Sequence, residues 1–429
     1  MIRDEIETLP REELEQLQLE RLQATLNRVY RNVAFYRKAF DEAGISPERI
    51  TSLEDLKLLP FTDRETLRRS QPYGMFALPL REVVRLQTTS GTTGDPIVVG
   101  YSRNDVEHWT ELMARSLAAA GVGKEDVVQI AFDYGLFTGA LGFHYGAERI
   151  GATVIPSSRT PPEKQIEIMR NYRTTVLACT PSFALEIAEA IRGSTLSPAE
   201  LSLRVGIFSA EPWPEEVRRE IEEALRITAF DCYGLGEVMG PGVSVECEHK
   251  NGLHIFEDHF IAEVIDPRTG EVLPDGEVGE LVLTTITKEA FPLIRYRTGD
   301  LTYLIREPCP CGRTTVRMGR VMERTDNMIV VRGVSLFPSQ IRRVIASIEG
   351  VEPRIRLVVD ESSGVPESLE VQVEVSEGVF TDDVGKLVRL EGRMKEMLEG
   401  ELGIPVEVRL VEPRSLSRDV EIVRLRRRT

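Results

Sequence analysis

The chain is poor in cysteine and in positive charge, and it has no long apolar run. Its 429 residues include five cysteines, too few for a disulfide framework. A formal net charge of −16 argues against non-specific binding to nucleic acid or to an anionic membrane. No run of about 18 apolar residues occurs, and the first residues lack the apolar core of a signal peptide. We therefore expect a cytoplasmic protein whose partners are neither nucleic acids nor membranes.

Two familiar catalytic motifs are also missing. No G-x-S-x-G elbow occurs, which argues against a serine hydrolase. The glycine-rich stretch that ends at Gly94 has no lysine after it, so it is not the G-x-x-x-x-G-K-S/T loop of nucleoside triphosphatases. Apolar residues make up 41% of the chain and charged residues 28%, which is typical of a soluble globular protein. A length of 429 residues predicts two or more domains.

Residues 89–96 consist of hydroxyl-bearing residues, glycines and turn formers. Gly91 and Gly94 let the backbone approach an anion closely, and the neighbouring hydroxyls are hydrogen-bond donors. An apolar, β-like run at 97–99 follows directly, which is unusual after a flexible linker. We therefore predict a phosphate-binding loop rather than a solvated linker between two strands, with contacts from Thr89, Ser90, Gly91, Thr92, Thr93 and Gly94.

From residue 105 to residue 231, apolar runs of β character alternate with amphipathic segments of helical period. We predict strands at 127–132, 153–155, 175–179, 204–208 and 227–231, and helices at 105–120, 162–172, 181–192 and 214–224. Alternation of this kind favours right-handed crossovers and a mainly parallel, helix-flanked sheet.

The N-terminal region reads as helical. The apolar pattern of residues 11–43 predicts one amphipathic helix that ends at Gly44. Further along, Thr62 and Asp63 can cap a helix that begins near Arg64.

The pattern changes after residue 253. Strands predicted at 254–265, 279–285 and 301–305 follow one another without helices between them, which indicates a β-rich subdomain over about 253–325. The remaining residues mix strands at 328–331, 354–359, 369–375 and 405–411 with helices at 338–347 and 382–399. The predicted fold class is α/β, with a large N-terminal domain at 1–325 and a small α+β C-terminal domain at 326–429.

Several segments resemble the adenylate-forming superfamily, which contains acyl-CoA synthetases, luciferases and the adenylation domains of peptide synthetases. They are the loop 89–94, Tyr233–Glu237, Tyr296–Asp300 and the stretch 323–334. The resemblance implies an enzyme that couples a carboxylic acid to ATP, giving an acyl-adenylate, and then to coenzyme A. It therefore implies ATP or AMP, Mg²⁺ and coenzyme A as ligands.

In the resembling enzymes these segments surround the nucleotide. Besides the loop, the implied nucleotide-binding residues are Ala210, Glu211, Pro212, Asp231, Tyr233, Gly234, Asp300 and Arg324. Asp300 would accept hydrogen bonds from both ribose hydroxyls, and Glu237 would bind Mg²⁺, which prefers hard oxygen ligands. The implied catalytic residues are Glu237, Thr92, Thr93 and Arg324, and Asp326 is the implied hinge between the domains.

Within the superfamily the chain most resembles phenylacetate-CoA ligase and its relatives. The matching segments are 134–139, 144–148, 258–260 and 333–341. By that likeness Tyr134, Phe137 and Gly139 line the acyl pocket, and aromatic walls suit an aryl or apolar acid. The two aromatic residues can equally belong to the core, so the identity of the acid stays open. The oligomeric state is open too, and a homodimer is one option.

A second group of residues has the chemistry of a metal site. Two cysteines form a C-x-C turn, and a third precedes an Asn-Gly hairpin signal that has a histidine on either side. We predict a closed, structural Cys₃His zinc site with His249 as the alternative fourth ligand and the set Cys247, His254, Cys309 and Cys311 as the first choice. The prediction assumes that residues 251–252 form a two-residue hairpin loop. The alternative is a pair of surface thiols beside a polar hairpin.

The end of the chain departs from the superfamily's pattern. The resembling enzymes carry near the C-terminus a lysine that stabilises charge during adenylation, whereas the last lysine here is Lys395. Asp95 also stands where the phosphate loop usually has a lysine, and Arg418 and Arg424 are poor substitutes for a compact ammonium group. We therefore expect adenylate formation to be slower by about 10² or more, with thioester formation preserved. The alternative function is a nucleotide- or acyl-CoA-binding homologue without ligase activity.

Overall fold

The structure is a computed structural model that describes residues 4–89, 96–136, 139–325, 329–336, 338–361, 366–376, 384–417 and 420–426. Some predicted site residues lie outside these ranges: Ser90, Gly91, Thr92, Thr93, Gly94, Phe137 and Asp326. Asp95 and Arg418 lie outside them as well. Within the described ranges no helix is both long and apolar enough to cross a membrane.

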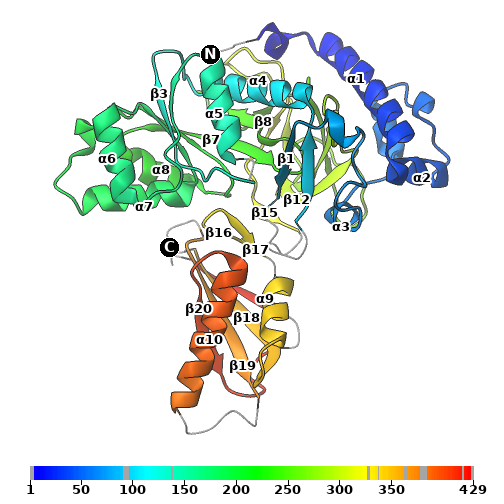
Figure 1. Ribbon diagram of the computed structural model, residues 1–429. Coiled ribbons are helices and arrows are strands. Elements are labelled where there is room, and N and C mark those ends of the chain that lie inside the picture. The colour runs from blue at the N-terminus through cyan, green and yellow to red at the C-terminus, as the bar shows by residue number, and fades with distance from the viewer. Residues whose placement is uncertain are drawn as a thin grey trace.

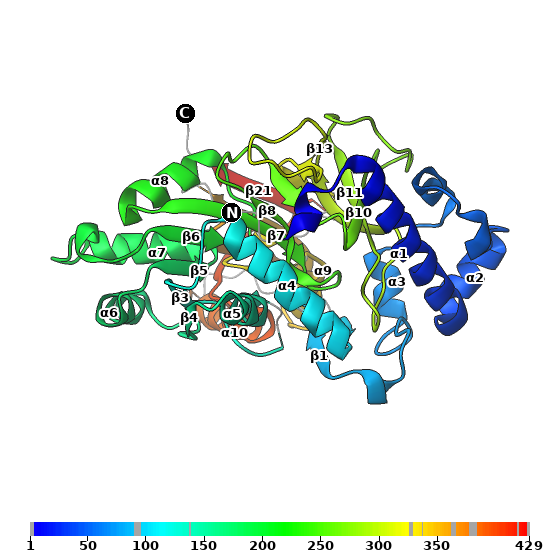
Figure 2. The same cartoon turned by 90° about the horizontal axis from the view of Figure 1, so that it is seen from above.

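A nine-stranded sheet forms the centre of the large domain, in the order β13-β14-β9-β8-β7-β6-β5-β3-β4 (Figures 1 and 2). Its strands are β3 (Val127–Ile130), β4 (Thr153–Ile155), β5 (Val176–Cys179), β6 (Val205–Phe208), β7 (Thr228–Leu235), β8 (Gly240–Glu246), β9 (Leu253–Ile255), β13 (Leu304–Ile305) and β14 (Arg317–Met318). The pairings from β4 to β7 are parallel, as predicted, whereas those from β7 to β13 are antiparallel. The sheet therefore changes character at β7.

Helices accompany the parallel half of this sheet. They are α4 (Arg103–Ala119), α5 (Gly139–Arg149), α6 (Pro162–Tyr172), α7 (Pro181–Arg192) and α8 (Glu215–Leu225). Helix α5 was not predicted, and it packs closely on α4 because its glycines present no side chain there. A Cβ at Gly142 would lie 2.7 Å from the indole ring of Trp109, and one at Gly146 would lie 2.6 Å from Met113. Figure 2 shows α4 and α5 next to each other.

Two smaller sheets complete the large domain. The β-rich subdomain is an antiparallel sheet in the order β10-β11-β12-β15, formed by β10 (Phe260–Ile265), β11 (Gly279–Thr285), β12 (Tyr296–Thr302) and β15 (Glu323–Arg324). A separate hairpin pairs β1 (Arg85–Thr88) with β2 (Val98–Tyr101), and Thr89 donates from its backbone N–H to Ile97 at 3.1 Å. The predicted phosphate loop is therefore the connection of a β-hairpin.

The N-terminal helices cross to the β-rich subdomain. The predicted single helix is two helices, α1 (Arg11–Asn32) and α2 (Ala34–Glu42), because Val33 between them has an extended backbone with φ −113° and ψ 108°. Helix α1 is tied to distant residues: the Gln18 amide donates to the Glu257 carbonyl at 2.9 Å, and the Thr25 hydroxyl donates to the Ile286 carbonyl at 3.1 Å.

Shorter helices fill the connections. Helix α3 (Arg64–Arg69) begins where predicted, and Asp63 caps it by accepting from the backbone N–H of Thr66. Short 3₁₀ helices lie at Glu5–Thr8, Pro47–Arg49, Leu53–Leu58, Leu80–Glu82 and Pro198–Glu200.

The C-terminal domain has its own four-stranded sheet, in the order β20-β19-β18-β21, and its own apolar core of residues from Ile329 onward. Its elements are β16 (Ile329–Val331), β17 (Val334–Leu336), α9 (Pro338–Ala346), β18 (Val351–Glu361), β19 (Ser368–Val375), α10 (Val384–Leu402), β20 (Glu407–Val411) and β21 (Glu421–Arg426). Strand β21 was not predicted. Figure 1 shows the β16–β17 hairpin at the end of this domain that faces the large domain.

Candidate active site

A cavity of about 620 Å³ lies at the edge of the parallel half of the large sheet. Ala131, Thr180 and Ser209 on its wall directly follow β3, β5 and β6, so the cavity sits at the carboxyl ends of these strands. This is the edge at which open α/β sheets bind ligands. The facing wall comes from the C-terminal domain, through the β16–β17 hairpin and residues 400–403 at the end of α10.

The structure brings most of the predicted nucleotide-binding residues to this cavity. Its wall includes Thr89, Ala210, Glu211, Pro212, Asp231, Tyr233, Gly234, Glu237, Asp300 and Arg324. These residues come from five separate stretches of the chain, so the cavity unites motifs that the sequence keeps apart. The rest of the predicted loop lies outside the described residues, and the roles of all these residues stay predictions.

Asp300 on β12 already has polar partners. Its carboxylate accepts a hydrogen bond from the Tyr233 hydroxyl at 2.7 Å and another from the Arg324 guanidinium, which also donates to the Thr298 carbonyl at 3.0 Å. Strands β12 and β15 pair Asp300 directly with Arg324, which explains how the ion pair is aligned. The carboxylate is buried and thus held in one orientation at the cavity wall.

The segment that follows β6 is held by Glu211. Its carboxyl group accepts from the Ser182 backbone N–H at 3.0 Å and from the Ser182 hydroxyl at 2.8 Å. Burial raises the pKa of Glu211 to about 7, and these hydrogen bonds only partly oppose the shift. Ala210 beside it has φ +75°, an uncommon conformation for a residue with a side chain, so the segment is held in a specific strained shape.

Asp231 on β7, the next strand, is a second acid with a raised pKa. Burial and the neighbouring charge of Glu246 raise the pKa of Asp231 to about 7. Its backbone N–H donates to Glu246 at 2.8 Å, and Arg218 forms a buried ion pair with Glu246. The acid on the cavity wall is thus backed by a charged pair behind it.

Glu237 faces a cation that the sequence motifs did not single out. Arg64, the first residue of α3, lies on the cavity wall with a guanidinium nitrogen 3.7 Å from a carboxylate oxygen of Glu237. The two side chains are 17% and 7% exposed, so water screens the pair only partly. Only the helix cap at Asp63 marked the position in the sequence, and a cap says nothing about a ligand.

The predicted acyl-pocket residues are divided. Gly139 lies on the cavity wall together with Phe132, which the sequence analysis did not name. Tyr134 is not part of that wall: its hydroxyl lies 3.1 Å from a ring nitrogen of His144, whose other nitrogen lies 3.2 Å from Glu148. The role of Tyr134 in acid binding stays a prediction, and Phe137 lies outside the described residues.

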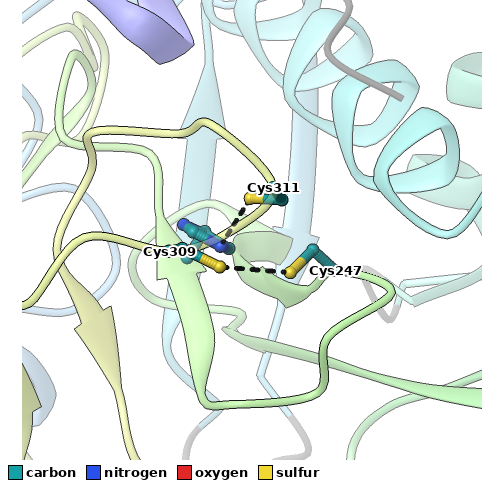
Figure 3. A group of neighbouring side chains, drawn as sticks. Cys247, Cys309 and Cys311 are labelled. Carbon is teal, nitrogen blue, oxygen red and sulfur yellow. Dashed lines mark hydrogen bonds between the residues drawn. The ribbon is translucent and has the colours of Figure 1, made fainter.

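The predicted metal ligands meet at one point (Figure 3). One ligand atom from each of Cys247, His254, Cys309 and Cys311 lies within 4.8 Å of the other three. The sulfur atoms of Cys247 and Cys309 are 3.7 Å apart, and the sulfur of Cys311 is 3.4 Å from Nε2 of His254. His249 does not belong to the group, and its side chain is 39% exposed.

These separations fit a tetrahedral zinc site. With Zn–S bonds of about 2.3 Å and Zn–N bonds of about 2.0 Å, tetrahedral geometry places sulfurs about 3.8 Å apart and sulfur about 3.5 Å from nitrogen. The other ring nitrogen of His254 lies 3.2 Å from the Thr315 hydroxyl, a partner that leaves Nε2 free to bind metal. Burial would raise the pKa of Cys311, but hydrogen bonds from His254 and Arg313 lower it to about 5, which favours the thiolate that metals bind.

The route by which these ligands meet differs from the predicted hairpin. Strands β8 and β9 pair Glu246 with Leu253, so the connection spans residues 247–252 and the two-residue Asn-Gly loop was wrong. Lys250 instead donates to the Cys247 carbonyl in a turn and has φ +49°. Gly252 in this longer loop has φ +84° and packs against β14, where a Cβ would lie 2.9 Å from the Met318 carbonyl.

Fold and cavity together define a two-domain α/β protein with a binding cavity at the carboxyl ends of its parallel strands, and comparison with known proteins identifies its family. The family model of the AMP-binding enzymes matches residues 10–287, and that of the AMP-binding enzyme C-terminal domain matches residues 333–425. The chain belongs to the AMP-binding enzyme family.

Relatives in this family include the phenylacetate-coenzyme A ligase of Thermus thermophilus, which is 46% identical over 96% of this chain and 96% of its own. Among solved structures, 2-hydroxyisobutyryl-CoA ligase with its adenylate and CoA in the thioester-forming state gives a TM-score of 0.91 at 30% identity, covering 98% of this chain and 92% of that one. The same ligase in a postadenylation state gives 0.72 at 28% identity, covering 97% and 89%.

Proposed function

We propose that this enzyme ligates an aryl carboxylic acid, with phenylacetate as the first candidate, to coenzyme A through an acyl-adenylate. The observation that carries the proposal is the cavity that joins the Asp300–Arg324–Tyr233 group to Glu237 and to the end of the predicted phosphate loop at Thr89. The near full-length similarity to a phenylacetate-coenzyme A ligase supports the choice of acid.

The reaction has two halves. In the first, the acid carboxylate attacks the α-phosphorus of ATP and pyrophosphate leaves. In the second, the coenzyme A thiol attacks the acyl carbonyl and AMP leaves. We assign Asp300 to the ribose hydroxyls and Arg324 to its orientation, because the pair is aligned on neighbouring strands. Glu237 would hold Mg²⁺, which supplies charge neutralisation at the phosphates, and Phe132 and Gly139 would border the acyl group.

We expect the first half-reaction, adenylation, to be slow because two lysines that the superfamily usually has are missing here. Arg424 forms an ion pair with Glu361 on the adjacent strand, so it does not stand in for the missing lysine in this domain arrangement. Arg64 offers a cation at the wall beside Glu237. We still expect slow adenylation, by about 10² relative to an enzyme with both lysines, because a guanidinium paired with a carboxylate is partly neutralised.

Pyrophosphate release from the wild-type enzyme, with a panel of aryl acids and with or without coenzyme A, tests the proposal. Acid-dependent release followed by CoA-dependent thioester formation is the expected result, with phenylacetate among the best substrates. Binding of AMP or acyl-CoA without turnover of any acid would instead favour a homologue that has lost ligase activity. A first half as fast as that of an ordinary acyl-CoA ligase would refute the expected slow adenylation.

We also propose that the Cys247, His254, Cys309 and Cys311 cluster holds one structural zinc ion. Four protein ligand atoms lie close enough to complete a tetrahedral site, so no position is left open for a substrate. Elemental analysis of untagged protein should find about one zinc per chain. Stoichiometric zinc that disappears in Cys309→Ser but not in His249→Ala would identify the ligands, and metal-free wild-type protein of unchanged stability would refute the site.

We further propose that Asp326 is the hinge between the large domain and the C-terminal domain. The apolar core of residues from Ile329 onward supports a C-terminal unit that can move as one body. The variant Asp326→Pro should slow steady-state turnover more than either half-reaction measured alone. A hinge residue must change its backbone angles between the two half-reactions, and proline restricts that change.

A further inference from the structure

One large-domain arginine lies directly under the turn of the C-terminal hairpin. Arg159 lies between β4 and α6, and its guanidinium donates to the backbone carbonyl of Arg332 at 2.9 Å. A second guanidinium nitrogen lies 3.2 Å from Glu186, and the group sits 4.9 Å above the ring of Phe183. The side chain is 26% exposed. Its contacts with Phe183 and Glu186, both on α7, fix it in one position at the domain boundary.

The segment that carries Arg159 is itself anchored. Asp133, which follows β3, accepts from the backbone N–H of Arg159 at 3.1 Å and from the Ser158 hydroxyl at 3.0 Å. Ser158 has φ +53°, a conformation that these hydrogen bonds maintain. The guanidinium is therefore preorganised by the large domain and does not depend on the hairpin for its orientation.

The turn that Arg159 contacts is a tight one. Val331 pairs with Val334, which leaves Arg332 and Gly333 as a two-residue turn with φ +50° and +77°. A Cβ on Gly333 would lie 3.1 Å from Thr180 and 3.4 Å from Glu211, so the turn fits against the cavity wall. The Arg332 side chain points back into its own domain, where it donates to the Glu367 carbonyl at 2.7 Å.

The contact belongs to one of two domain arrangements. The whole chain superposes on 2-hydroxyisobutyryl-CoA ligase with a TM-score of 0.91 in its thioester-forming state and 0.72 in a postadenylation state, at nearly equal coverage. Those two structures of one ligase differ in arrangement, and this chain matches the first.

We propose that Arg159 is a positioning residue for the thioester-forming half-reaction, which it serves by holding the Arg332–Gly333 turn against the cavity. The inference rests on the proposed ligase function. A charge-assisted hydrogen bond to a carbonyl favours the docked arrangement. We expect a smaller effect on adenylation, because the turn takes this place in the arrangement that matches the thioester-forming state.

The test separates the two half-reactions in Arg159→Ala, Arg159→Lys and the control Arg192→Ala. Arg192 also pairs with a glutamate across two large-domain helices, Glu220 at 3.2 Å, and among the described residues it has no hydrogen bond to the C-terminal domain. Acid-dependent exchange of pyrophosphate into ATP reports the first half. Single-turnover thioester formation from preformed phenylacetyl-adenylate and coenzyme A reports the second.

In Arg159→Ala we expect thioester formation to fall about tenfold while pyrophosphate exchange stays within about twofold of wild type. Arg159→Lys should restore part of the rate of thioester formation, because an ammonium group can reach the Arg332 carbonyl. It lacks the planar guanidinium that contacts the carbonyl and Glu186 at the same time. Arg192→Ala should change neither rate. A fluorescence-transfer pair with one dye on each domain should show fewer docked molecules in Arg159→Ala.

An equal loss in both halves would overturn the inference, as would unchanged thioester formation or an unchanged docked population. If Arg159→Ala does not fold, Arg159→Lys and Glu186→Gln carry the same test, since both weaken the fork. Wild-type protein that performs neither half-reaction would refute the proposed function instead, so the two failures are distinguishable.

Discussion

The cavity and the cysteine cluster are built in the same way but present their polar groups differently. Each gathers side chains from distant stretches of one chain. In the cavity, Asp300 and Glu237 lie on the wall of a space that a ligand can enter. In the cluster, Cys247 and His254 are each 1% exposed, and one ligand atom from each of the four residues lies within 4.8 Å of the others. Under the proposed function the first group serves a reaction and the second serves stability, so we expect mutations in the two groups to affect different measurements.

The largest effect should come from Glu237→Gln. Loss of the carboxylate removes the expected Mg²⁺ ligand, so adenylation should fall by about 10³-fold, while the melting temperature changes little. Pyrophosphate exchange and thermal unfolding measure the two quantities. The matched control is Glu107→Gln, which weakens a surface pair with Arg149 and should leave the rate unaltered. A rate within tenfold of wild type for Glu237→Gln would remove this residue from the chemistry.

Cys309→Ser should give the opposite pattern. A serine hydroxyl is a poor zinc ligand, so the variant should lose its metal and melt roughly 5 °C lower or more, with turnover at 25 °C close to that of wild type. His249→Ala is the control, since that side chain lies outside the cluster. Loss of turnover at temperatures where the variant is folded would break the division between the two groups.

Asp300→Ala should weaken AMP binding by about 2 kcal/mol, or roughly 30-fold, with the fold intact. The change removes charge-assisted hydrogen bonds to the ribose and also leaves Tyr233 and Arg324 without the carboxylate that aligns them. Titration calorimetry measures the AMP affinity. The affinity of Asp300→Asn, which keeps one acceptor oxygen, should lie between those of wild type and Asp300→Ala. Equal affinities in wild type and both variants would contradict the assignment.

The smallest predicted effect sharpens the comparison, because Glu211 lies on the cavity wall and yet should influence stability. Its folded pKa is raised to about 7, so the folded state prefers the protonated carboxyl. The stabilising contribution is complete below the unfolded pKa and is lost as pH rises through 7. Lowering the pH from 8 to 5 should therefore raise the free energy of unfolding by about 2 kcal/mol more in wild type than in Glu211→Gln. Parallel pH profiles in chemical denaturation would argue that the acid is not buried.

The sequence predicted the parallel half of the sheet well, because each strand there is a short apolar run between helices. It missed α5 and β8 for a shared reason. Gly142 and Gly146 lower the helix propensity of α5, yet the close approach to α4 requires them. Strand β8 begins Gly240-Pro241-Gly242, which reads as a turn although it is a buried strand. In both cases tertiary packing outweighs local preference.

The candidate site was predictable where residue type alone implies chemistry. Three cysteines and a histidine in two short segments indicate a metal, and the segment Tyr296–Asp300 resembles a known motif. Arg64 and Arg159 were not predictable in this way. Surface arginines are common, and only the folded chain places one opposite Glu237 and the other under the Arg332 carbonyl.

The attachment of α1 to residues far along the chain has a consequence for biosynthesis. Gln18 bonds a residue 239 positions later, and Thr25 bonds one 261 positions later. At about 5–20 residues per second, the ribosome needs roughly 12 to 50 s to make that intervening stretch. During this interval α1 can pack against α2 and the two 3₁₀ helices that follow it, but not against residues 257 to 286. The N-terminal helices of a nascent chain therefore wait for the β-rich subdomain before they reach their final place in the large domain.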